Sequence, residues 1–326
     1  MSLEAAWLPA QIRWTAQGPL LDWCHLGDLR LTDPFFEQTV GRAMTHPFNL
    51  VFRRSTPLDV LDAPARFELR PAGFIFHMSR CGSTLISQML ASLPQNVVLS
   101  EPGPIDQILR APARLAGLTA DRLAAWVRAM AAALGRSRQP DERDLFIKFE
   151  GWHVLLFGLI RRAFPDVPWV FVYRDPVEVM ASLARMRPAQ MLPGGIDPGL
   201  TGIAAADAAD MSLDRYGALV LAQFCGAALR HYGTDGGLLI GHSELPEAVC
   251  TRLTDHFGLR YGGAELAHMR AAAQRNAKHP DAPYADDGEA KRHGASAEIR
   301  ELAAEILAPF HARLEALNTA RRAERQ

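Results

Sequence analysis

Two short segments of the sequence combine basic and hydroxyl side chains in patterns suited to binding anions. The first runs from Ser79 to Thr84 and reads Ser-Arg-Cys-Gly-Ser-Thr, after an apolar run and before a helical pattern. Gly82 allows a tight turn, Ser83 and Thr84 add hydroxyl donors at the helix start, and Arg80 adds a positive charge. The pattern indicates an anion-binding loop, although a plain capped helix after a glycine turn would give similar residues.

Two better-known phosphate loops do not fit this segment. A nucleotide triphosphatase loop requires Gly, four residues and then Gly-Lys-Ser/Thr. No lysine follows Gly82, and no glycine precedes it at the required distance. A phosphatase loop requires a cysteine followed by five residues and an arginine, but Ser87 stands at that offset from Cys81. Cys81 is therefore predicted to be a small loop residue and not a nucleophile.

The second segment is Arg174-Asp175-Pro176 with Ser182 six residues after the proline. It follows an apolar strand pattern and opens a helix. An arginine at a strand end and a hydroxyl two turns into the next helix can hold one phosphate group between them. The alternative is an Arg-Asp surface pair ahead of a helix that starts with proline.

Together, the two segments resemble the motifs of the sulfotransferases that use PAPS (3′-phosphoadenosine 5′-phosphosulfate) and release PAP. The family loop Arg-Ser-Gly-Thr-Thr is matched by Arg80, Gly82, Ser83 and Thr84, with Cys81 in place of a serine. The resemblance implies that this loop, Cys81 included, holds the 5′-phosphosulfate. It also implies that Arg174 and Ser182 hold the 3′-phosphate. It extends over residues 73–259.

Catalytic roles are expected for Arg80 and for two residues at the ends of consecutive strand patterns, Glu101 and Lys148, for which the same resemblance implies them. Glu101 stands where one branch of the family, which includes the tyrosylprotein enzymes, places a glutamate as general base. Its other interpretations are a helix cap or a partner of Arg80. Lys148 resembles the family lysine that stabilises the leaving group. Burying a lysine in an apolar strand costs folding free energy unless an anion pairs with it.

Two further residues complete the expected site. Glu150 occupies the position at which cytosolic sulfotransferases place a catalytic histidine, so it is the reserve candidate for the base. Lys278, or another cation in 275–292, is expected to close on the nucleotide. Sulfuryl transfer requires no metal in principle, and the sequence suggests no metal-ligand cluster.

The elements that must position these residues alternate between apolar strands and helices. Strands are predicted at 74–77, 96–99, 145–149, 169–173 and 238–240, and helices at 85–93, 120–134, 153–164, 177–186, 245–257 and 296–317. This alternation predicts an α/β fold with a P-loop-like parallel sheet flanked by helices on both faces, because continuous apolar strands are typical of such sheets. The polar residues of the two motifs, with Glu101 and Lys148, then lie at the carboxyl ends of the strands, where α/β folds bind ligands.

The sequence predicts an N-terminal extension (1–70) packed on a main α/β domain (71–320). Residues 188–210 and 276–294 have the composition of mobile loops that could cover the site. The net charge of −1 gives no general attraction to nucleic acid or to an anionic membrane. The four cysteines form no Cys-x-x-Cys pair, and no run of ~18 apolar residues predicts a membrane span.

A cytoplasmic PAPS-dependent sulfotransferase is the function that the sequence favours. The acceptor is expected to be a small molecule or a peptide with a hydroxyl or amine, and the sequence indicates neither its identity nor an oligomeric state. Two alternatives remain: a P-loop small-molecule kinase using ATP and Mg²⁺, or a non-catalytic anion-binding module on the same scaffold.

Overall fold

A five-stranded parallel sheet forms the centre of the protein. The structure is a computed structural model that describes residues 6–324 except 279–280, 284 and 286. The strands are β4 (Pro71–His77), β5 (Asn96–Ser100), β6 (Asp144–Lys148), β7 (Trp169–Tyr173) and β8 (Leu238–Gly241). Their order is β5-β6-β4-β7-β8, and all neighbours are parallel. The predicted α/β class and its parallel sheet are confirmed.

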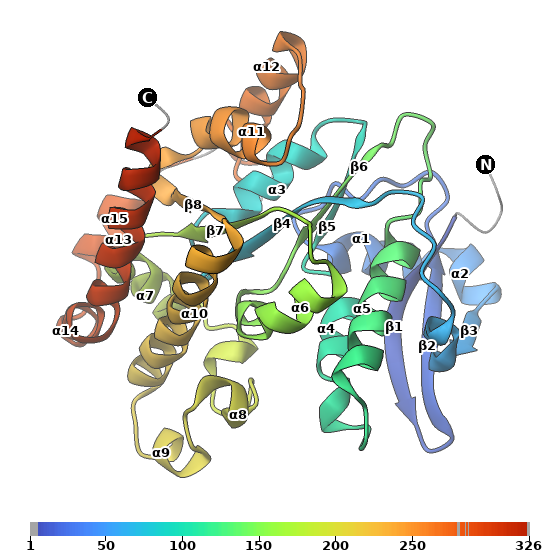
Figure 1. Cartoon of the computed structure of the whole chain (residues 1–326), viewed down its shortest axis with the longest axis horizontal. Helices are drawn as coiled ribbons and strands as arrows, with labels where there is room; N and C mark the ends of the chain where they lie inside the picture. The colour runs from blue at the N-terminus through green and yellow to red at the C-terminus, as the bar shows by residue number, and fades with distance from the viewer. Residues whose placement is uncertain (1–5, 279–280, 284, 286, 325–326) are drawn as a thin grey trace.

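Helices cover both faces of this sheet (Figure 1). The elements that follow the strands are α3 (Ser83–Ala91), α4 (Gly103–Leu109), η2 (Ala111–Ala113), α5 (Ala120–Leu134), η3 (Gly151–Leu156), α6 (Phe157–Ala163) and α7 (Pro176–Arg185). After β8 come η5 (His242–Glu244), η6 (Val249–Leu253), α11 (Thr254–His256), α12 (Gly263–Ala272) and α13 (Gly288–His293). The hydroxyl of Thr119 accepts the Arg122 N–H and caps α5.

The chain between α7 and β8 is more helical than its composition suggests. It holds η4 (Ala189–Met191), α8 (Pro198–Thr201), α9 (Ala205–Ala209) and the long α10 (Leu213–Asp235). The sequence did not predict α10. Its apolar residues are buried around most of the helix, so they form no single stripe with a helical period. The predicted C-terminal helix consists of α14 (Ala297–Leu302), the π-helix η7 (Ala303–Leu307) and α15 (Ala308–Ala323).

A small antiparallel sheet precedes the central sheet. It consists of β1 (Trp7–Thr15), β2 (Gly18–His25) and β3 (Arg54–Pro57), with α1 (Phe36–Met44), α2 (Pro47–Val51) and η1 (Leu58–Asp62) beside it. This sheet and α15 lie on opposite sides of the molecule (Figure 1). The Ile12 N–H donates to Gln107 on α4 at 2.5 Å, and the Trp126 indole on α5 donates to Asp62 at 2.7 Å. A domain boundary at residue 70 stays a prediction.

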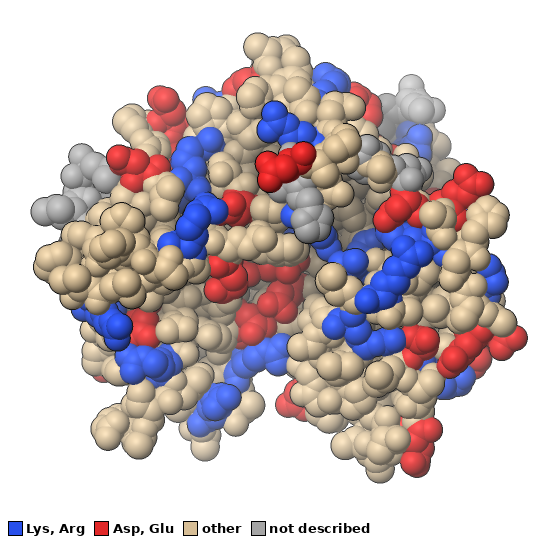
Figure 2. All heavy atoms as spheres, turned by 180° about the vertical axis from the view of Figure 1, so that it is seen from behind, with Lys and Arg blue, Asp and Glu red and all other residues tan. Residues whose placement is uncertain are grey.

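The face drawn in Figure 2 shows no continuous field of one charge. On the face opposite to the view of Figure 1, basic and acidic side chains are interspersed, and acidic atoms gather in the hollow near its middle (Figure 2). Among the described residues, no helix combines the length and the apolar character needed to cross a bilayer.

Candidate active site

The loop between β4 and α3 has an unusual backbone. Ser79 (φ 77°) and Arg80 (φ 52°) adopt left-handed conformations, and so does Gly82 (φ 93°) at the N-cap of α3. Non-glycine residues rarely adopt this region, and such strain is concentrated at functional sites. A Cβ atom at Gly82 would lie 2.7 Å from Cδ1 of Leu245, so a side chain would also clash there. The tight turn places the start of α3, with its unpaired N–H groups, at the carboxyl end of β4.

The thiol of Cys81 faces the sheet. Cys81 is fully buried, and its Sγ donates to the Val172 carbonyl on β7 at 3.1 Å. Burial raises the pKa of this thiol to about 11, which fits a structural residue and not a nucleophile. The side chain therefore offers nothing to a ligand in the loop. Any contact that Cys81 makes with a nucleotide would come from its backbone.

The two sequence motifs meet in the structure through one hydrogen bond. Arg80 Nε donates to Ser182 Oγ at 2.7 Å, although 102 positions separate the two residues. The contact is possible because β4 and β7 are neighbouring strands, so that the loop after β4 lies beside helix α7, which follows β7. The proposed phosphosulfate loop and the proposed 3′-phosphate pair thus lie side by side.

Carboxylates engage the guanidinium of Arg174. Its Nε donates to Glu178 at 2.5 Å and its Nη2 to Asp287 at 3.2 Å. Asp287 also accepts from Lys291 at 2.7 Å, and Glu178 pairs with Arg292. These contacts join α7 to α13. A phosphate at Arg174 would compete with Asp287 and Glu178 for the same donors.

Lys148 and Glu101 form an ion pair at the ends of two adjacent strands. Ser100 is paired with Lys148 in the sheet register, and Lys148 Nζ lies 2.7 Å from Glu101 Oε1. The Lys148 side chain is fully buried, and Nζ also approaches Thr84 Oγ1 at 3.3 Å. Glu101 is therefore the anion that pairs with this buried lysine. The contact with Thr84 connects the ion pair to the loop after β4.

Glu101 is held in its ionised form. Burial alone would raise its pKa, but the Lys148 charge and the His77 contact outweigh burial and hold the pKa well below its usual range. Its backbone is left-handed (φ 55°). The partner of Glu101 is Lys148 and not Arg80, which corrects that alternative interpretation. The contacts of Lys148 and of His77 with this carboxylate both reach Oε1.

An aromatic ring from the N-terminal region covers the two lysines of the site. The ring centroid of Phe35 lies 5.1 Å from Lys148 Nζ and 5.8 Å from Lys278 Nζ. Burial, followed by the like charges of Arg80 and Lys148, lowers the pKa of Lys278 to about 8. The structure thus brings Lys278 to the same site as the other predicted cations.

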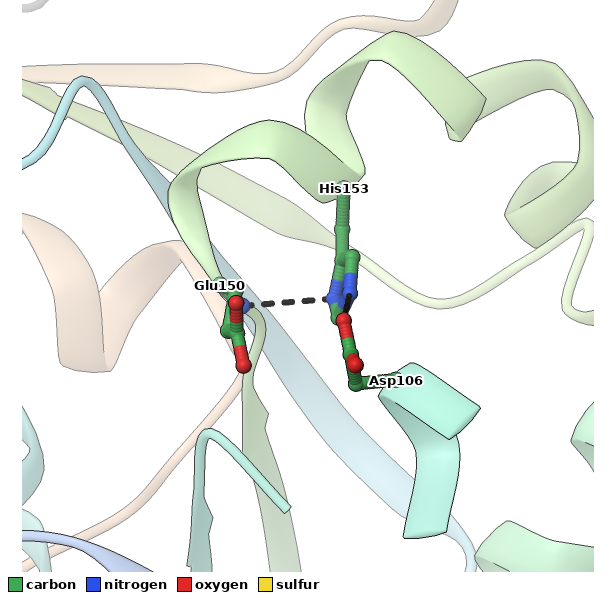
Figure 3. A group of neighbouring side chains, drawn as sticks. All are labelled: Asp106, Glu150 and His153. Atoms are coloured by element: carbon green, nitrogen blue, oxygen red, sulfur yellow. Dashed lines mark hydrogen bonds and ion pairs between the residues drawn. The ribbon is translucent and has the colours of Figure 1, made fainter. Parts of the chain in front are cut away.

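Two further carboxyl groups, those of Asp106 and Glu150, lie close to His153 (Figure 3). His153 Nε2 lies 3.1 Å from Asp106 Oδ1, and the Trp152 indole donates to Asp106 and to Glu150 at 3.1 and 3.2 Å. Burial and the neighbouring charges of Asp106 and Glu101 raise the pKa of Glu150 to about 8. Two adjacent glutamates therefore have opposite pKa shifts, because Lys148 neutralises only Glu101.

The ligand atoms of Asp106, Glu150 and His153 lie within 4.8 Å of one another, which is close enough for a shared metal ion. Their hydrogen bonds fit an ion poorly. The Glu150 backbone N–H donates to His153 Nδ1 at 3.3 Å, so the proton of the neutral ring is on Nε2 and faces Asp106 (Figure 3). Both imidazole nitrogens are therefore engaged. The group is better described as two carboxyl groups that share the Trp152 indole as a hydrogen-bond donor.

All the predicted site residues lie along one edge of the sheet. The neighbours that were not predicted include Phe35, Asp106 and Asp287. Phe35 lies far away in the sequence and carries no chemical signal. Asp106 stands five residues after Glu101 in a pattern that reads as an ordinary helix, and Asp287 stands in a region rich in acidic residues.

Comparisons with known proteins address the identity of the fold. Residues 71–195 match the family model described as the sulfotransferase family, and this segment contains both motifs and the Glu101–Lys148 pair. Residues 71–195 belong to the sulfotransferase family. The resemblance found in the sequence is confirmed, and the enzyme class it indicates is that of a sulfotransferase. No curated protein sequence matches the chain.

Solved sulfotransferases resemble the chain only distantly. A sulfotransferase from Mycobacterium avium is 16% identical (TM-score 0.46), covering 84% of this chain and 82% of its own. One from Alicyclobacillus acidocaldarius is 17% identical (TM-score 0.43), with coverages of 77% and 96%. A mouse sulfotransferase in complex with PAP is 10% identical (TM-score 0.36), with coverages of 74% and 83%. At these TM-scores the assignment depends on the family match and the two motifs.

Proposed function

We propose that this sulfotransferase uses PAPS as donor and transfers its sulfuryl group to a hydroxyl or amine of an acceptor. The contact between Arg80 and Ser182 is the observation that carries the proposal, because it joins the two motifs at one edge of the sheet. A donor with a 5′-phosphosulfate and a 3′-phosphate has two anionic groups, which these motifs can bind. The mouse sulfotransferase, crystallised with PAP, supports this choice of donor.

Each site residue then has a defined task. The loop at 79–84 and Arg80 bind the phosphosulfate, and Arg174 with Ser182 binds the 3′-phosphate, with Lys278 adding charge from the segment after α12. Glu101 Oε2 accepts the proton of the acceptor as its oxygen or nitrogen forms the new bond to sulfur. Lys148 stabilises the phosphate oxygen that keeps the electrons of the broken S–O bond. Positioning and preorganised charge supply most of the rate.

Calorimetry distinguishes this proposal from its two alternatives. PAP should bind to the purified chain without metal, and 5′-AMP should bind at least about tenfold more weakly, because it lacks the phosphate that Arg174 and Ser182 would hold. Ser182→Ala should reduce the difference between PAP and 5′-AMP while leaving 5′-AMP binding intact. Binding of ATP-Mg²⁺ with no response to PAP would favour the kinase. Binding of PAP without release of labelled sulfate from PAPS, to water or to any acceptor, would favour a non-catalytic module.

Substitution of the two glutamates identifies the base. Glu101→Gln should lower sulfuryl transfer from labelled PAPS by about 10²- to 10⁴-fold, the usual contribution of a general base. Glu150→Gln is the matched change at the reserve candidate, and it should cost much less because Glu150 holds its proton near neutral pH. A larger loss in Glu150→Gln than in Glu101→Gln would move the base to Glu150.

A further inference from the structure

His77, the last residue of β4, lies beneath the proposed site with its two ring nitrogens in different environments. Its exposed fraction is 5%. Nδ1 accepts the Ser79 N–H at 3.0 Å, so in the neutral ring the proton is on Nε2. Burial lowers the pKa of His77, and the charge of Lys148 acts in the same direction, while Glu101 acts against them. The ring is therefore a neutral donor with a defined direction.

The Nε2–H of His77 has no aligned hydrogen-bond partner among the described residues, although the atom is fully buried. It lies 3.3 Å from Glu101 Oε1, but not in hydrogen-bond alignment. A buried donor without a partner is costly and unusual in a folded protein. The donor thus lies beside the carboxylate that is proposed to take the acceptor proton, and a small rotation of that carboxylate would satisfy it.

Lys148 holds the same carboxylate oxygen, Oε1, at 2.7 Å. In the proposed reaction Lys148 must turn toward the leaving oxygen of the donor, which weakens its hold on Glu101. The carboxylate would then lose its contact with Lys148 at the moment when its orientation matters. A second donor on Oε1 would keep Oε2 directed at the acceptor.

We propose that His77 is a positioning residue, which donates its Nε2–H to Oε1 of Glu101 when the donor is bound and so holds Oε2 toward the acceptor. The inference rests on the proposed function of Glu101 as base. It also joins two strained positions, since Ser79 (φ 77°) contacts Nδ1 and Glu101 (φ 55°) faces Nε2. One imidazole thereby couples the phosphosulfate loop to the base.

Other charged groups face Glu101 and also affect its titration. Lys148 approaches from β6 and Lys278 from the segment after α12, and both favour the ionised carboxylate. Glu150, which follows β6, interacts with Glu101 as a like charge. Each of these groups is unchanged in a His77 variant, so a shift in the Glu101 titration between variants reports the loss of the His77 contact.

Two substitutions separate the two ring nitrogens of His77. His77→Gln can place an N–H donor near the Nε2 position, while His77→Asn can keep an acceptor for Ser79 near Nδ1 but loses the donor. The first measurement is the Glu101 pKa, read by NMR of ¹³C-labelled glutamate carboxyls in the free and the PAP-loaded protein, with Glu101→Gln used to assign the signal. The second is the pH profile of kcat for release of labelled sulfate from PAPS. Melting temperatures confirm that each variant is folded.

His77→Asn should raise the Glu101 pKa in the PAP-loaded protein by about one unit, because the carboxylate loses a donor. It should also move the acid limb of kcat upward by the same shift and lower kcat by about tenfold, with KM for PAPS within about twofold. His77→Gln should keep the Glu101 pKa and kcat close to their wild-type values. Equal losses in the two variants, or an unchanged pKa in His77→Asn, would overturn the proposal.

Failure of the proposed function gives a different result. If PAP does not bind to the wild-type chain, the donor assignment fails. The effect of His77 on the Glu101 pKa is still measurable in the free protein, where a shift in His77→Asn that is absent in His77→Gln would support the contact alone. If the Glu101 pKa does not shift in His77→Asn, the proposal that His77 positions Glu101 is contradicted as well. A His77 with only a packing role would change the melting temperature and leave the Glu101 pKa unaltered.

Discussion

Glu150 shows how strongly the position of one lysine determines the chemistry of neighbouring carboxylates. Glu150 and Glu101 follow adjacent strands, and each is partly covered by protein. Only Glu101 has an ammonium group within 3 Å, that of Lys148 at 2.7 Å. Glu150 receives a hydrogen bond from the Trp152 indole but no cation at that distance. Its pKa is therefore raised to about 8, while that of Glu101 is lowered.

The raised pKa of Glu150 predicts a pH-dependent cost to stability. In the unfolded chain this carboxyl ionises near its ordinary pKa of 4.5, whereas in the folded chain it keeps its proton up to about pH 8. The unfolded state therefore binds fewer protons than the native state between these values, and stability falls as pH rises through this window. Glu150→Gln removes this ionisation. Between pH 5 and pH 8, the free energy of unfolding of the variant should therefore rise by at least about 1 kcal/mol relative to that of the wild type.

Denaturant unfolding at a series of pH values checks this expectation. Glu301→Gln, at an exposed position on α14, is the matched control and should follow the wild-type curve. Parallel curves for wild type and Glu150→Gln would show that Glu150 is ionised in the folded protein. In that case Glu150 could accept a proton and would again be a candidate for the general base.

At single positions, the sequence predicted which residues gather at the site but not how they pair. Arg80, Lys148 and Arg174 were predicted because their types and spacing match motifs that bind anions. That Glu101 pairs with Lys148 depends on strand order, since β5 and β6 are neighbours in the sheet although α5 lies between them in the chain. Phe35 could not be predicted, because its place over two lysines depends on how residues 30–37 cross the sheet edge.

Helices α7 and α13 are joined through the arginine that is expected to bind a phosphate. Asp287, directly before α13, lies 3.2 Å from Arg174 Nη2 and 2.7 Å from Lys291 Nζ. Lys291 is buried, and the neighbouring charge of Arg174 contributes to lowering its pKa, after burial itself. The carboxylate of Asp287 thus bridges two cations that a bound phosphate could also bridge.

Asp287→Asn should therefore strengthen PAP binding. Removal of this charge ends the competition for Arg174, and a gain of roughly three- to tenfold in affinity is expected for one charged hydrogen bond on a half-exposed group. Calorimetry with PAP measures it, and 5′-AMP should gain less because it lacks the 3′-phosphate. Glu289→Gln, an exposed change in the first turn of the same helix, is the control. Weaker PAP binding in Asp287→Asn would show that Asp287 orients Arg174 and does not compete for it.

The prediction of elements succeeded where burial gives a regular pattern. The five strands of the central sheet were predicted because strands covered on both faces read as continuous apolar runs. Helix α10 and the strands β1 to β3 were not predicted from the sequence. The sheet of β1 to β3 mixes proline and charged residues with apolar ones, and its register shifts between Pro9 and Gln11, which breaks the alternation expected of a strand.

At the scale of the whole molecule, the N-terminal sheet is tied to the active-site edge at several points. Ser100 Oγ, at the end of β5, donates to the Pro34 carbonyl at 2.8 Å, and Arg30 donates to the Leu93 carbonyl after α3 at 2.7 Å. Phe35, directly after Pro34, covers Lys148. The region before residue 70 thus forms one wall of the site, and its packing is expected to influence the site directly.

These ties predict that the N-terminal sheet and the central sheet unfold as one cooperative unit. Leu21 on β2 is fully buried, and Leu21→Ala should cost about 2–5 kcal/mol of folding free energy. Native-state hydrogen exchange should show the amides of β2 and β4 losing protection by the same amount, because their opening is shared. Val51→Ala, at a position 71% exposed on α2, is the control and should change neither strand. Loss of protection in β1 to β3 alone would show that residues 1–70 open as a separate unit, and that Phe35 can leave the two lysines without unfolding the rest of the site.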